Sequence, residues 1–451
     1  MTTPSRITRR SAIKAMAAAG ISAPFVYRAH LHAQPSATLN HASFGAGGMA
    51  WSDIQSLARS PHLQLVAVAE VDTARTAEVR KRFPQARLYQ DWRELLDKEK
   101  DLQSCNISTP DHMHAPITMR AMQQGLHVYT QKPLTQTIYE ARQLTRVARE
   151  RRIISQMGIQ IHSDARHKMV VELIQAGAIG KVREVHSWSN KTWGERLPRP
   201  DQTDTPPATL NWDQWLGVAA ERPYIGPYNV APRRREPYYH PGNWRKRLDF
   251  GTGTFGDMGC HILDPVYAAL SLTSPLSVRA ESGAPNEHNW GLDCQVQYTF
   301  PGTKVTTDRL SLTWYDGNAR PPAAVRNLIG KRDLNDQGSI YIGADGVLYS
   351  PYIAAPILLP EERFRDYKRP TPTNDNHYLQ FVEAVRGNGR TSAPFDYAGP
   401  LTEMVLLGCL ATRFQKTTLE WDAAKMQVTN NRDATAKVRK TYRKGWEVTG
   451  L

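Results

Sequence analysis

The sequence predicts an α/β protein with two domains, the first built on a doubly wound parallel sheet and the second on an open, mostly antiparallel sheet. Strand-like and helix-like segments alternate from residue 37 to about residue 160, as consecutive β–α units require. Beyond residue 160 the pattern changes to runs with period-two alternation, which is typical of antiparallel strands. A chain of 451 residues is also too long for one ordinary hydrophobic core.

The first domain begins with "ATLNHASFGAGGMAWSDIQSLAR", which has the order strand, tight turn and helix. The following "LQLVAVAEVD" is a nearly continuous apolar strand, as expected for a strand buried on both faces of a parallel sheet. The same alternation continues with expected strands at 101–110 and 126–135, and expected helices at 114–125 and 138–152.

The second domain begins with "HKMVVELIQAGAIGKVREVHSWSN", a helix with a glycine stop followed by an alternating strand. Residues 191–250 are rich in Pro, Trp and Arg and form too long a segment for a simple loop, so we expect them to be functional or partly structured. Strand-like segments then follow, and "GADG" is typical of a hairpin turn. We expect two further helices, at 376–387 and 398–415.

Residues 1–33 resemble a twin-arginine export signal. Arg9 and Arg10 lie in "TRRSAIK", an apolar stretch runs from Ala15 to Tyr27, and "LHA" offers a cleavage point at Ala33. An ordinary basic N-terminus and an uncleaved anchor are the alternatives. No later segment approaches 18 apolar residues, so we expect no stable membrane span after processing and a periplasmic or extracytoplasmic location. The mature domains are then expected to cover 34–160 and 161–451.

The composition argues against a nucleic-acid partner. The chain has 57 Lys and Arg against 43 Asp and Glu, a formal charge of +14. Residues 1–33 contribute five basic residues and no acid, so about +9 remains after processing. No long basic run and no nucleic-acid-binding motif is present in the sequence. The four cysteines are far apart and lack CxxC spacing, which favours buried free thiols over a disulfide framework.

The glycine-rich turn "FGAGGMA" predicts a dinucleotide site, and thereby a Rossmann domain. Gly45 suits a tight turn, Gly47 lets the backbone approach a pyrophosphate, and Ala50 allows close packing. Glu70, about 20 residues beyond the last glycine, could bind the ribose hydroxyls, with Asp72 as the neighbouring candidate. A carboxylate there favours NAD over NADP.

Arg75 and Arg80 lie a few residues beyond Glu70 and Asp72, so NADP remains an alternative cofactor.

Two further segments end expected strands and should face the same cleft. In "STPDHMHAPI", Thr109 and Pro110 could line the nicotinamide side, because ligands bind beyond the carboxyl ends of parallel strands. His112 and His114 lack a nearby third ligand, so we expect no metal there. "TQKPLT" places Lys132 at another strand end.

The segment "FGDMGCHILDP" places Asp257 and His261 four residues apart, on one face of an expected helix. Such a pair could be a catalytic base with the carboxylate that orients it, two ligands of an incomplete metal site, or a helix cap beside a buried histidine. Oxidation of a secondary alcohol needs a base that takes the proton, and histidine suits that task. Asp264 is expected to be a structural partner and Cys260 a packing residue.

Five motifs in this order resemble the glucose–fructose oxidoreductase/inositol dehydrogenase family, also called Gfo/Idh/MocA. They are "FGAGGMA", "STPDHMHA", "TQKPLT", "AGAIGKV" and "GDMGCHILD", and they span about residues 37–300. The resemblance implies that Lys132 lies close to the reacting hydroxyl and the nicotinamide, and that His261 of the Asp257–His261 pair is the acid/base. Gln131 stands where the family usually has Glu. The C-terminal segments "FDYAGPLTEMVLLGCLATR" and "YRKGW" resemble the exported bacterial subgroup.

The expected site combines these motifs, and we expect no metal ion in it. The expected catalytic residues are Lys132, Asp257 and His261. The expected cofactor-binding residues are Gly45, Gly47, Gly48, Met49, Glu70, Asp72, Ser108, Thr109, Pro110, His114, Lys132 and Gln160. The expected substrate-binding residues are Lys132, Arg166, Trp244, Arg245, Asp257 and His261, because aromatic rings pack on sugar CH faces and arginine forks bind vicinal hydroxyls or carboxylates. Weaker substrate candidates are His162, Tyr238, Tyr239, His240 and His377.

The sequence therefore predicts an exported oxidoreductase that uses NAD, with NADP as the alternative, to oxidise or reduce a secondary hydroxyl of a sugar, glycoside or polyol. We expect the cofactor to be tightly bound and the protein to be a dimer or tetramer. Two alternatives stay open: a redox-neutral lyase or glycosidase that recycles a bound NAD, and a cofactor-bound sensor without turnover.

Overall fold

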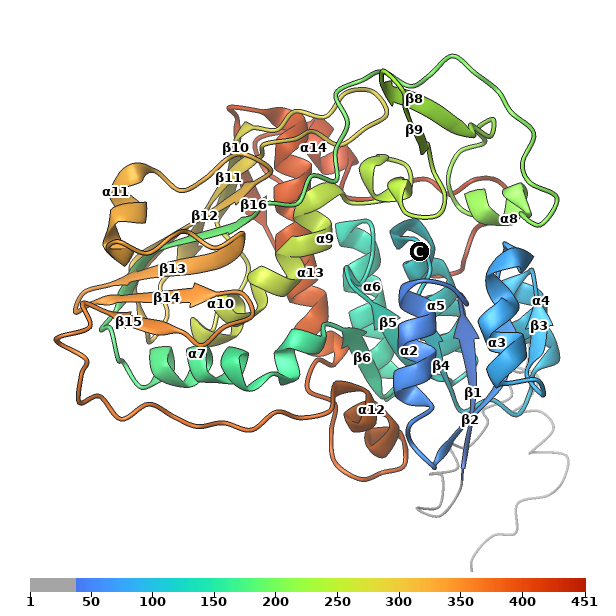
Figure 1. The fold of residues 1–451 in the computed structure, drawn as a ribbon, viewed down its shortest axis with the longest axis horizontal. Coiled ribbons are helices and arrows are strands. Elements are labelled where there is room, and N and C mark those ends of the chain that lie inside the picture. Colours follow the sequence, from blue (N-terminus) through green and yellow to red (C-terminus); the bar gives the residue numbers. More distant parts are fainter. Residues whose placement is uncertain (1–37) are drawn as a thin grey trace, which may run out of the picture. The chain divides into compact units, whose positions relative to one another are not determined.

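The computed structural model describes residues 38–451 (Figure 1). The expected export signal at residues 1–33 lies outside these described residues.

The first sheet has six strands in the order β3-β2-β1-β4-β5-β6, and every neighbouring pair is parallel. This order is that of a doubly wound Rossmann sheet, with its topological switch point between β1 and β4. The Rossmann prediction is confirmed. The strands are β1 (Leu39–Phe44), β2 (Leu63–Ala69), β3 (Arg87–Tyr89), β4 (Ser104–Ile107), β5 (His127–Gln131) and β6 (Ser155–Gly158).

Helices and short 3₁₀ turns connect these strands. The N-terminus of α6 (Ile138–Glu150) is fixed by a capping box, in which the Thr137 hydroxyl accepts a hydrogen bond from the Glu140 amide and the Glu140 carboxylate accepts one from the Thr137 amide. The connecting elements are α2 (Met49–Leu57), η1 (Thr73–Thr76), α3 (Ala77–Arg82), α4 (Trp92–Lys98), η2 (Asp111–Met113), α5 (His114–Gln123), α6 (Ile138–Glu150), η3 (Gln160–Ser163) and α7 (Ala165–Gln175).

The second sheet has nine strands in the order β15-β14-β13-β7-β12-β11-β10-β16-β17. Only the pair β7–β12 is parallel, so the prediction of an open, mostly antiparallel sheet is confirmed. In β11 exposed or half-buried residues alternate with buried ones, as expected when one face of a sheet is covered. The strands are β7 (Val182–Ser189), β10 (Ser277–Ser282), β11 (Gln295–Pro301), β12 (Thr306–Asp316), β13 (Gln337–Gly343), β14 (Val347–Pro351), β15 (Ile357–Leu359), β16 (Thr418–Asp422) and β17 (Gln427–Val428).

Helices α9 (Gly253–Ile262) and α13 (Phe395–Ala411) pack against this second sheet (Figure 1). α13 is buried on nearly all sides because it also packs against α6 of the first domain. The Arg142 guanidinium of α6 donates to the Glu403 carboxylate of α13 at 2.6 and 3.0 Å. The remaining helices are α10 (Asp264–Ala269), α11 (Ala323–Arg326), η5 (Asn327–Ile329), α12 (His377–Val385), η6 (Thr412–Phe414) and α14 (Arg432–Ala436).

The long segment 191–250 is partly structured, as the sequence suggests. It contains a hairpin, two short helical turns and a small aromatic core of its own that includes Trp215, Tyr239 and Phe250. Aromatic side chains supply large buried area to a segment with little regular structure. Its elements are α8 (Trp212–Leu216), β8 (Pro227–Ala231), β9 (Arg234–Pro237) and η4 (Asn243–Lys246).

The described part of the chain contains no helix that is long and apolar enough to cross a membrane. All four cysteines are buried and free, as expected from their spacing.

Candidate active site

A cleft of about 560 Å³ lies beyond the carboxyl ends of β1, β2, β4 and β5. Helix α9 and the segment 191–250 close its other side. This is the crevice in which doubly wound sheets bind their ligands. The lining includes Gly45, Gly47, Gly48, Met49, Glu70, Arg75, Ser108, Thr109, Pro110, Asp111, His114, Lys132, Lys191, Trp193, His240, Trp244, Arg245, Asp257 and His261.

The glycine-rich turn between β1 and α2 leaves its backbone open to the cleft. Gly45 has a φ of +104°, and a Cβ there would lie 2.8 Å from the Ser108 carbonyl oxygen. A Cβ at Gly47 would lie 2.5 Å from Nε of Arg75. α2 then begins at Met49 without a side-chain cap or an acidic residue in its first turn, so its amide groups are available to an anion. These features fit the pyrophosphate of a dinucleotide.

The two acidic candidates for the ribose have different surroundings. Glu70 lines the cleft, and its carboxylate accepts hydrogen bonds from the amides of Ala46 and Asp72 at 2.9 and 3.1 Å. Burial raises the pKa of Glu70. Asp72 is outside the lining: it caps η1 through the Ala74 amide and faces His240 Nε2 at 3.0 Å. The structure therefore favours Glu70 and corrects the expectation for Asp72.

Lys132 forms the central contact of the cleft. Its ammonium donates to Oδ1 and to the backbone carbonyl of Asp257, each at 2.7 Å. Nε of Arg245 approaches the same Oδ1 at 3.3 Å. Burial opposes ionisation of Asp257, but the two cations outweigh it and hold the pKa of this carboxyl well below its usual range. A carboxylate thus shares its charge between two cationic groups that line the cleft.

His261 lies one helical turn beyond Asp257 and lines the same cleft. The structure does not show Asp257 as the orienting carboxylate of His261. Asp257 is engaged by Lys132 and Arg245, and Nδ1 of His261 is buried without a hydrogen-bond partner among the described residues. Burial and the Lys132 charge lower the pKa of His261 to about 3, so its imidazole is neutral near pH 7.

Two aromatic rings surround the guanidinium of Arg245. Its Cζ lies 4.2 Å from the Trp244 ring centroid and 5.4 Å from that of Trp193. Trp193 and Lys191 line the cleft, and sequence reasoning missed both. Their only sequence signal is membership of the Trp- and Arg-rich segment 191–250.

Asp111 is a further lining residue that sequence reasoning missed, although it lies in the "STPDHMHA" motif. Its carboxyl accepts a hydrogen bond from the Thr252 hydroxyl at 2.7 Å. Burial raises its pKa to about 7, and only part of that effect is offset by the Thr252 bond and the Arg245 charge. The cleft therefore contains two carboxyl groups, the ionised Asp257 and Asp111, whose pKa lies near neutral pH.

Gln131 binds a buried carboxylate rather than Lys132's ammonium. Its amide nitrogen donates to both oxygens of Asp53, at 3.0 and 2.9 Å. Burial raises the pKa of Asp53 to about 6. A glutamate at position 131 would place a second carboxylate against Asp53, so the amide suits this chain.

Gln160 and Arg166 do not line the cleft, contrary to expectation. The Gln160 amide donates to the hydroxyls of Tyr129 and Tyr378 at 3.1 and 3.0 Å, in the network around Asp53. Arg166 forms an ion pair with Asp164 and lines a different cavity. Gln160 is thus held by partners distant in sequence, and Arg166 by the carboxylate two residues before it.

The weaker substrate candidates also differ in whether they line the cleft. Only His240 lines the cleft. Tyr238 and Tyr239 belong to the aromatic core of segment 191–250, and His377 is bonded to Ser163 and to the Met157 carbonyl. His162 contacts Asp264 instead of the cleft.

Comparisons with known proteins agree with this architecture. Residues 39–159 match the family model "Oxidoreductase family, NAD-binding Rossmann fold", and residues 181–448 match "Oxidoreductase family, C-terminal alpha/beta domain". Inositol 2-dehydrogenase of Rubrobacter xylanophilus is 30% identical over 146 residues, which are 32% of this chain and 42% of that protein. The chain matches less than half of the length of this relative.

Two solved structures share the fold. Aldose-aldose oxidoreductase from Caulobacter crescentus, complexed with glycerol, has a TM-score of 0.55 at 16% identity, covering 85% of this chain and 100% of that chain. GenD2 from gentamicin A biosynthesis, in complex with NAD, has a TM-score of 0.57 at 17% identity, covering 86% and 98%. Because the two family models together cover most of the sequence, the chain belongs to the Gfo/Idh/MocA family of oxidoreductases.

Proposed function

We propose that the protein transfers a hydride between a nicotinamide cofactor and a secondary hydroxyl of a sugar, glycoside or polyol. The observation that carries this proposal is the convergence on one cleft of an open glycine turn, the Lys132 ammonium and the His261 imidazole. The named activity of the inositol 2-dehydrogenase relative supports a polyol or sugar as substrate.

Lys132 would stabilise the substrate oxygen. An ammonium group has three hydrogens. Lys132 donates two of them to Asp257, which leaves one for a substrate hydroxyl in the cleft. Asp257 fixes the position of that ammonium, and the positive charge lowers the free energy of a developing alkoxide. When bound, the nicotinamide supplies the hydride acceptor or donor.

His261 would take the hydroxyl proton. Its neutral form carries a lone pair that can accept one, and it borders the cleft beside Lys132 and Asp257. Trp193 and Trp244 offer faces to the CH groups of a sugar ring, and Arg245 offers donors to its hydroxyls.

Replacement of Lys132 by Met should lower kcat by about 10²- to 10⁴-fold, because alkoxide stabilisation is lost while the volume is nearly kept. His261→Gln should cause a loss of the same order. Steady-state NADH formation with a panel of sugars and polyols measures both. Lys98→Met is the matched control, since Lys98 forms a surface ion pair with Glu94 outside the cleft. Wild-type turnover in both cleft variants would exclude the proposed roles.

The pH dependence should reflect the lowered pKa of His261. A base with a pKa of about 3 is almost entirely unprotonated above about pH 4. Protonation of His261 should therefore lower activity only at a pH below about 4. We expect kcat/KM for alcohol oxidation to show no acid limb between about pH 5 and about pH 8. A limb centred near the ordinary value of 6.5 that disappears in His261→Gln would contradict this assignment.

We further propose NAD as the preferred cofactor, since the Glu70 carboxylate would repel a 2′-phosphate. The Arg75 guanidinium lies against Gly47 in the cleft lining, with Glu70 and His240 near enough to feel its charge, so it can also face the pyrophosphate. Arg75→Ala should weaken NADH binding about tenfold in a fluorescence titration. The control is Arg80→Ala, because Arg80 is bonded to Thr76 outside the cleft. A wild-type protein that binds NADPH more tightly than NADH would refute the preference.

Export and assembly are proposed from the sequence. The twin arginines support transport of a folded, cofactor-loaded protein, and the open second sheet offers a face for a dimer or tetramer. The full chain should appear in the periplasmic fraction of a bacterial host, with a mass by light scattering of two or four chains. Arg9→Lys/Arg10→Lys should retain it in the cytoplasm. Equal distribution of both forms would exclude this export route, and a single-chain mass would exclude the oligomer.

A further inference from the structure

A second group of polar side chains converges beside the catalytic helix, outside the cleft. His162 comes from η3, His167 from α7 and Asp264 from the start of α10. Nδ1 of His162 lies 3.0 Å from both carboxylate oxygens of Asp264, and Nε2 of His167 lies 2.7 Å from Oδ2. One nitrogen from each histidine and one carboxylate oxygen all lie within 4.8 Å of one another.

Hydrogen bonding alone does not satisfy this group. Nε2 of His167 is buried and has no hydrogen-bond partner in the described part of the chain, although Oδ2 is only 2.7 Å away. The close contact therefore lacks the direction of a hydrogen bond. An unpaired buried ring nitrogen beside a carboxylate is costly unless a further group contacts both of them.

The carboxylate also needs a positively charged neighbour, either a protonated histidine of this group or a metal ion. Asp264 is fully buried, with 0% of its side chain exposed. Its other described partner is the Tyr397 hydroxyl, which donates to Oδ1 and brings no charge. Buried carboxylates are compensated by protonated partners or by metal ions. Arg166, the nearest guanidinium along α7, is already paired with Asp164.

Two imidazole nitrogens and one carboxylate oxygen form a donor set typical of divalent zinc, iron and related metals. Ligand atoms about 2.1 Å from such an ion are about 3.4 Å apart at tetrahedral angles and about 3.0 Å apart at the angles of about 90° in an octahedral site. The observed nitrogen-to-oxygen distances of 2.7–3.0 Å are closer to the octahedral spacing. Each histidine nitrogen therefore needs only a small shift relative to the carboxylate to share an ion with it.

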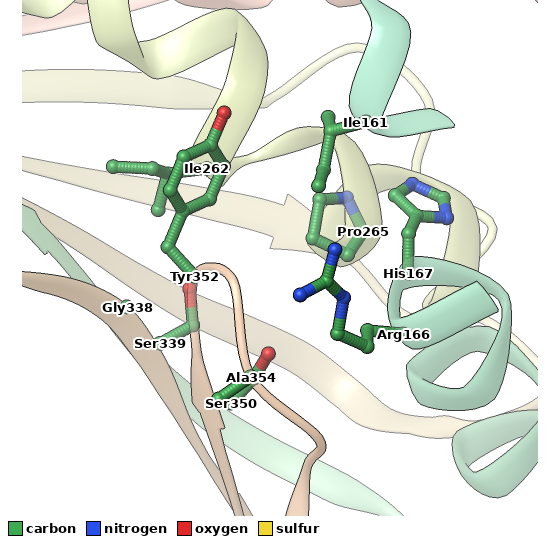
Figure 2. Close-up of a pocket in the computed structure, with 10 residues that line it drawn as sticks. All are labelled: Ile161, Arg166, His167, Ile262, Pro265, Gly338, Ser339, Ser350, Tyr352 and Ala354. Carbon is green, nitrogen blue, oxygen red and sulfur yellow. The ribbon is translucent and has the colours of Figure 1, made fainter. Parts of the chain in front are cut away.

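A small cavity adjoins His167 and could hold a further ligand. Its volume is about 10 Å³, close to the space that one water molecule needs. Figure 2 shows Arg166 and His167 reaching into it from α7, opposite Tyr352 and Ser350 of the β14 end. The Tyr352 ring also contacts the His261 ring, with centroids 6.1 Å apart.

We propose that His162, His167 and Asp264 bind one divalent transition-metal ion that is structural rather than catalytic. The ion fixes the start of α10 to η3 and α7. Since α10 follows α9 directly, it also fixes the end of the helix that carries His261. This site is separate from the cleft and independent of the proposed hydride transfer.

The test uses the full chain stripped with a chelator and then loaded with Zn²⁺ or Co²⁺. We expect about one Zn²⁺ per chain by elemental analysis after gel filtration, and visible Co²⁺ absorption bands of a nitrogen/oxygen site. His167→Gln and Asp264→Asn should lower the bound metal at least tenfold. His186→Gln should retain it, because His186 is equally buried but pairs with Glu184 away from the cluster.

The wild-type measurement decides the proposal even if these variants fold poorly. Less than about 0.1 equivalent of Zn²⁺, with no Co²⁺ bands, would overturn it. His162→Gln provides a milder variant, because His162 is the most exposed of the three ligands. Unchanged metal content in a folded His162→Gln protein would place the ion elsewhere and would also overturn the assignment. None of these readouts depends on turnover, so failure of the redox proposal would leave them unaffected.

Discussion

The ion pair between Lys132 and Asp257 is the contact on which the site depends. Lys132 follows the last residue of β5 in the first sheet, whereas Asp257 lies in the middle of α9, which packs on the second sheet. The 2.7 Å contact therefore joins the two domains across the cleft. Both side chains are only 13–14% exposed, so removal of one partner would leave a poorly solvated charge. The pair thus couples the placement of the ammonium to the relative position of the domains.

This ion pair also determines the protonation states around it. The Lys132 charge adds to burial in lowering the pKa of His261, so that imidazole stays neutral. Asp257 remains ionised because Lys132 and Arg245 face it, whereas Asp111 has a pKa near 7 because burial dominates there. The two carboxyl groups of the cleft thus differ in protonation: Asp257 is ionised, whereas the pKa of Asp111 lies near neutral pH. The difference arises because Asp257, and not Asp111, contacts the Lys132 ammonium.

The sequence predicted the fold and most of the cleft because both depend on local patterns. Alternating apolar segments specify the two sheets, and residues at the ends of parallel strands necessarily meet at one edge. Partners of individual side chains were less predictable. The four-residue spacing puts Asp257 and His261 on one face of α9, but Lys132, 125 residues away, takes the carboxylate. Gln160 is bonded to Tyr378, 218 residues away, because tertiary packing selects among several chemically suitable partners, whereas Arg166 pairs locally with Asp164, two residues before it.

The spacing of His112 and His114 bears only on ligands close in sequence, so it says nothing about ligands distant in sequence. Asp264 lies 97 residues beyond His167, and only packing of α10 against α7 brings them together. The consequence concerns His261, which lies between Asp257 and Asp264 on consecutive helical turns. Asp257 is held by Lys132 from the first domain, and Asp264 by two histidines of η3 and α7. A histidine without a hydrogen-bonded orienting carboxylate can therefore still be positioned, because the backbone on both sides of it is fixed.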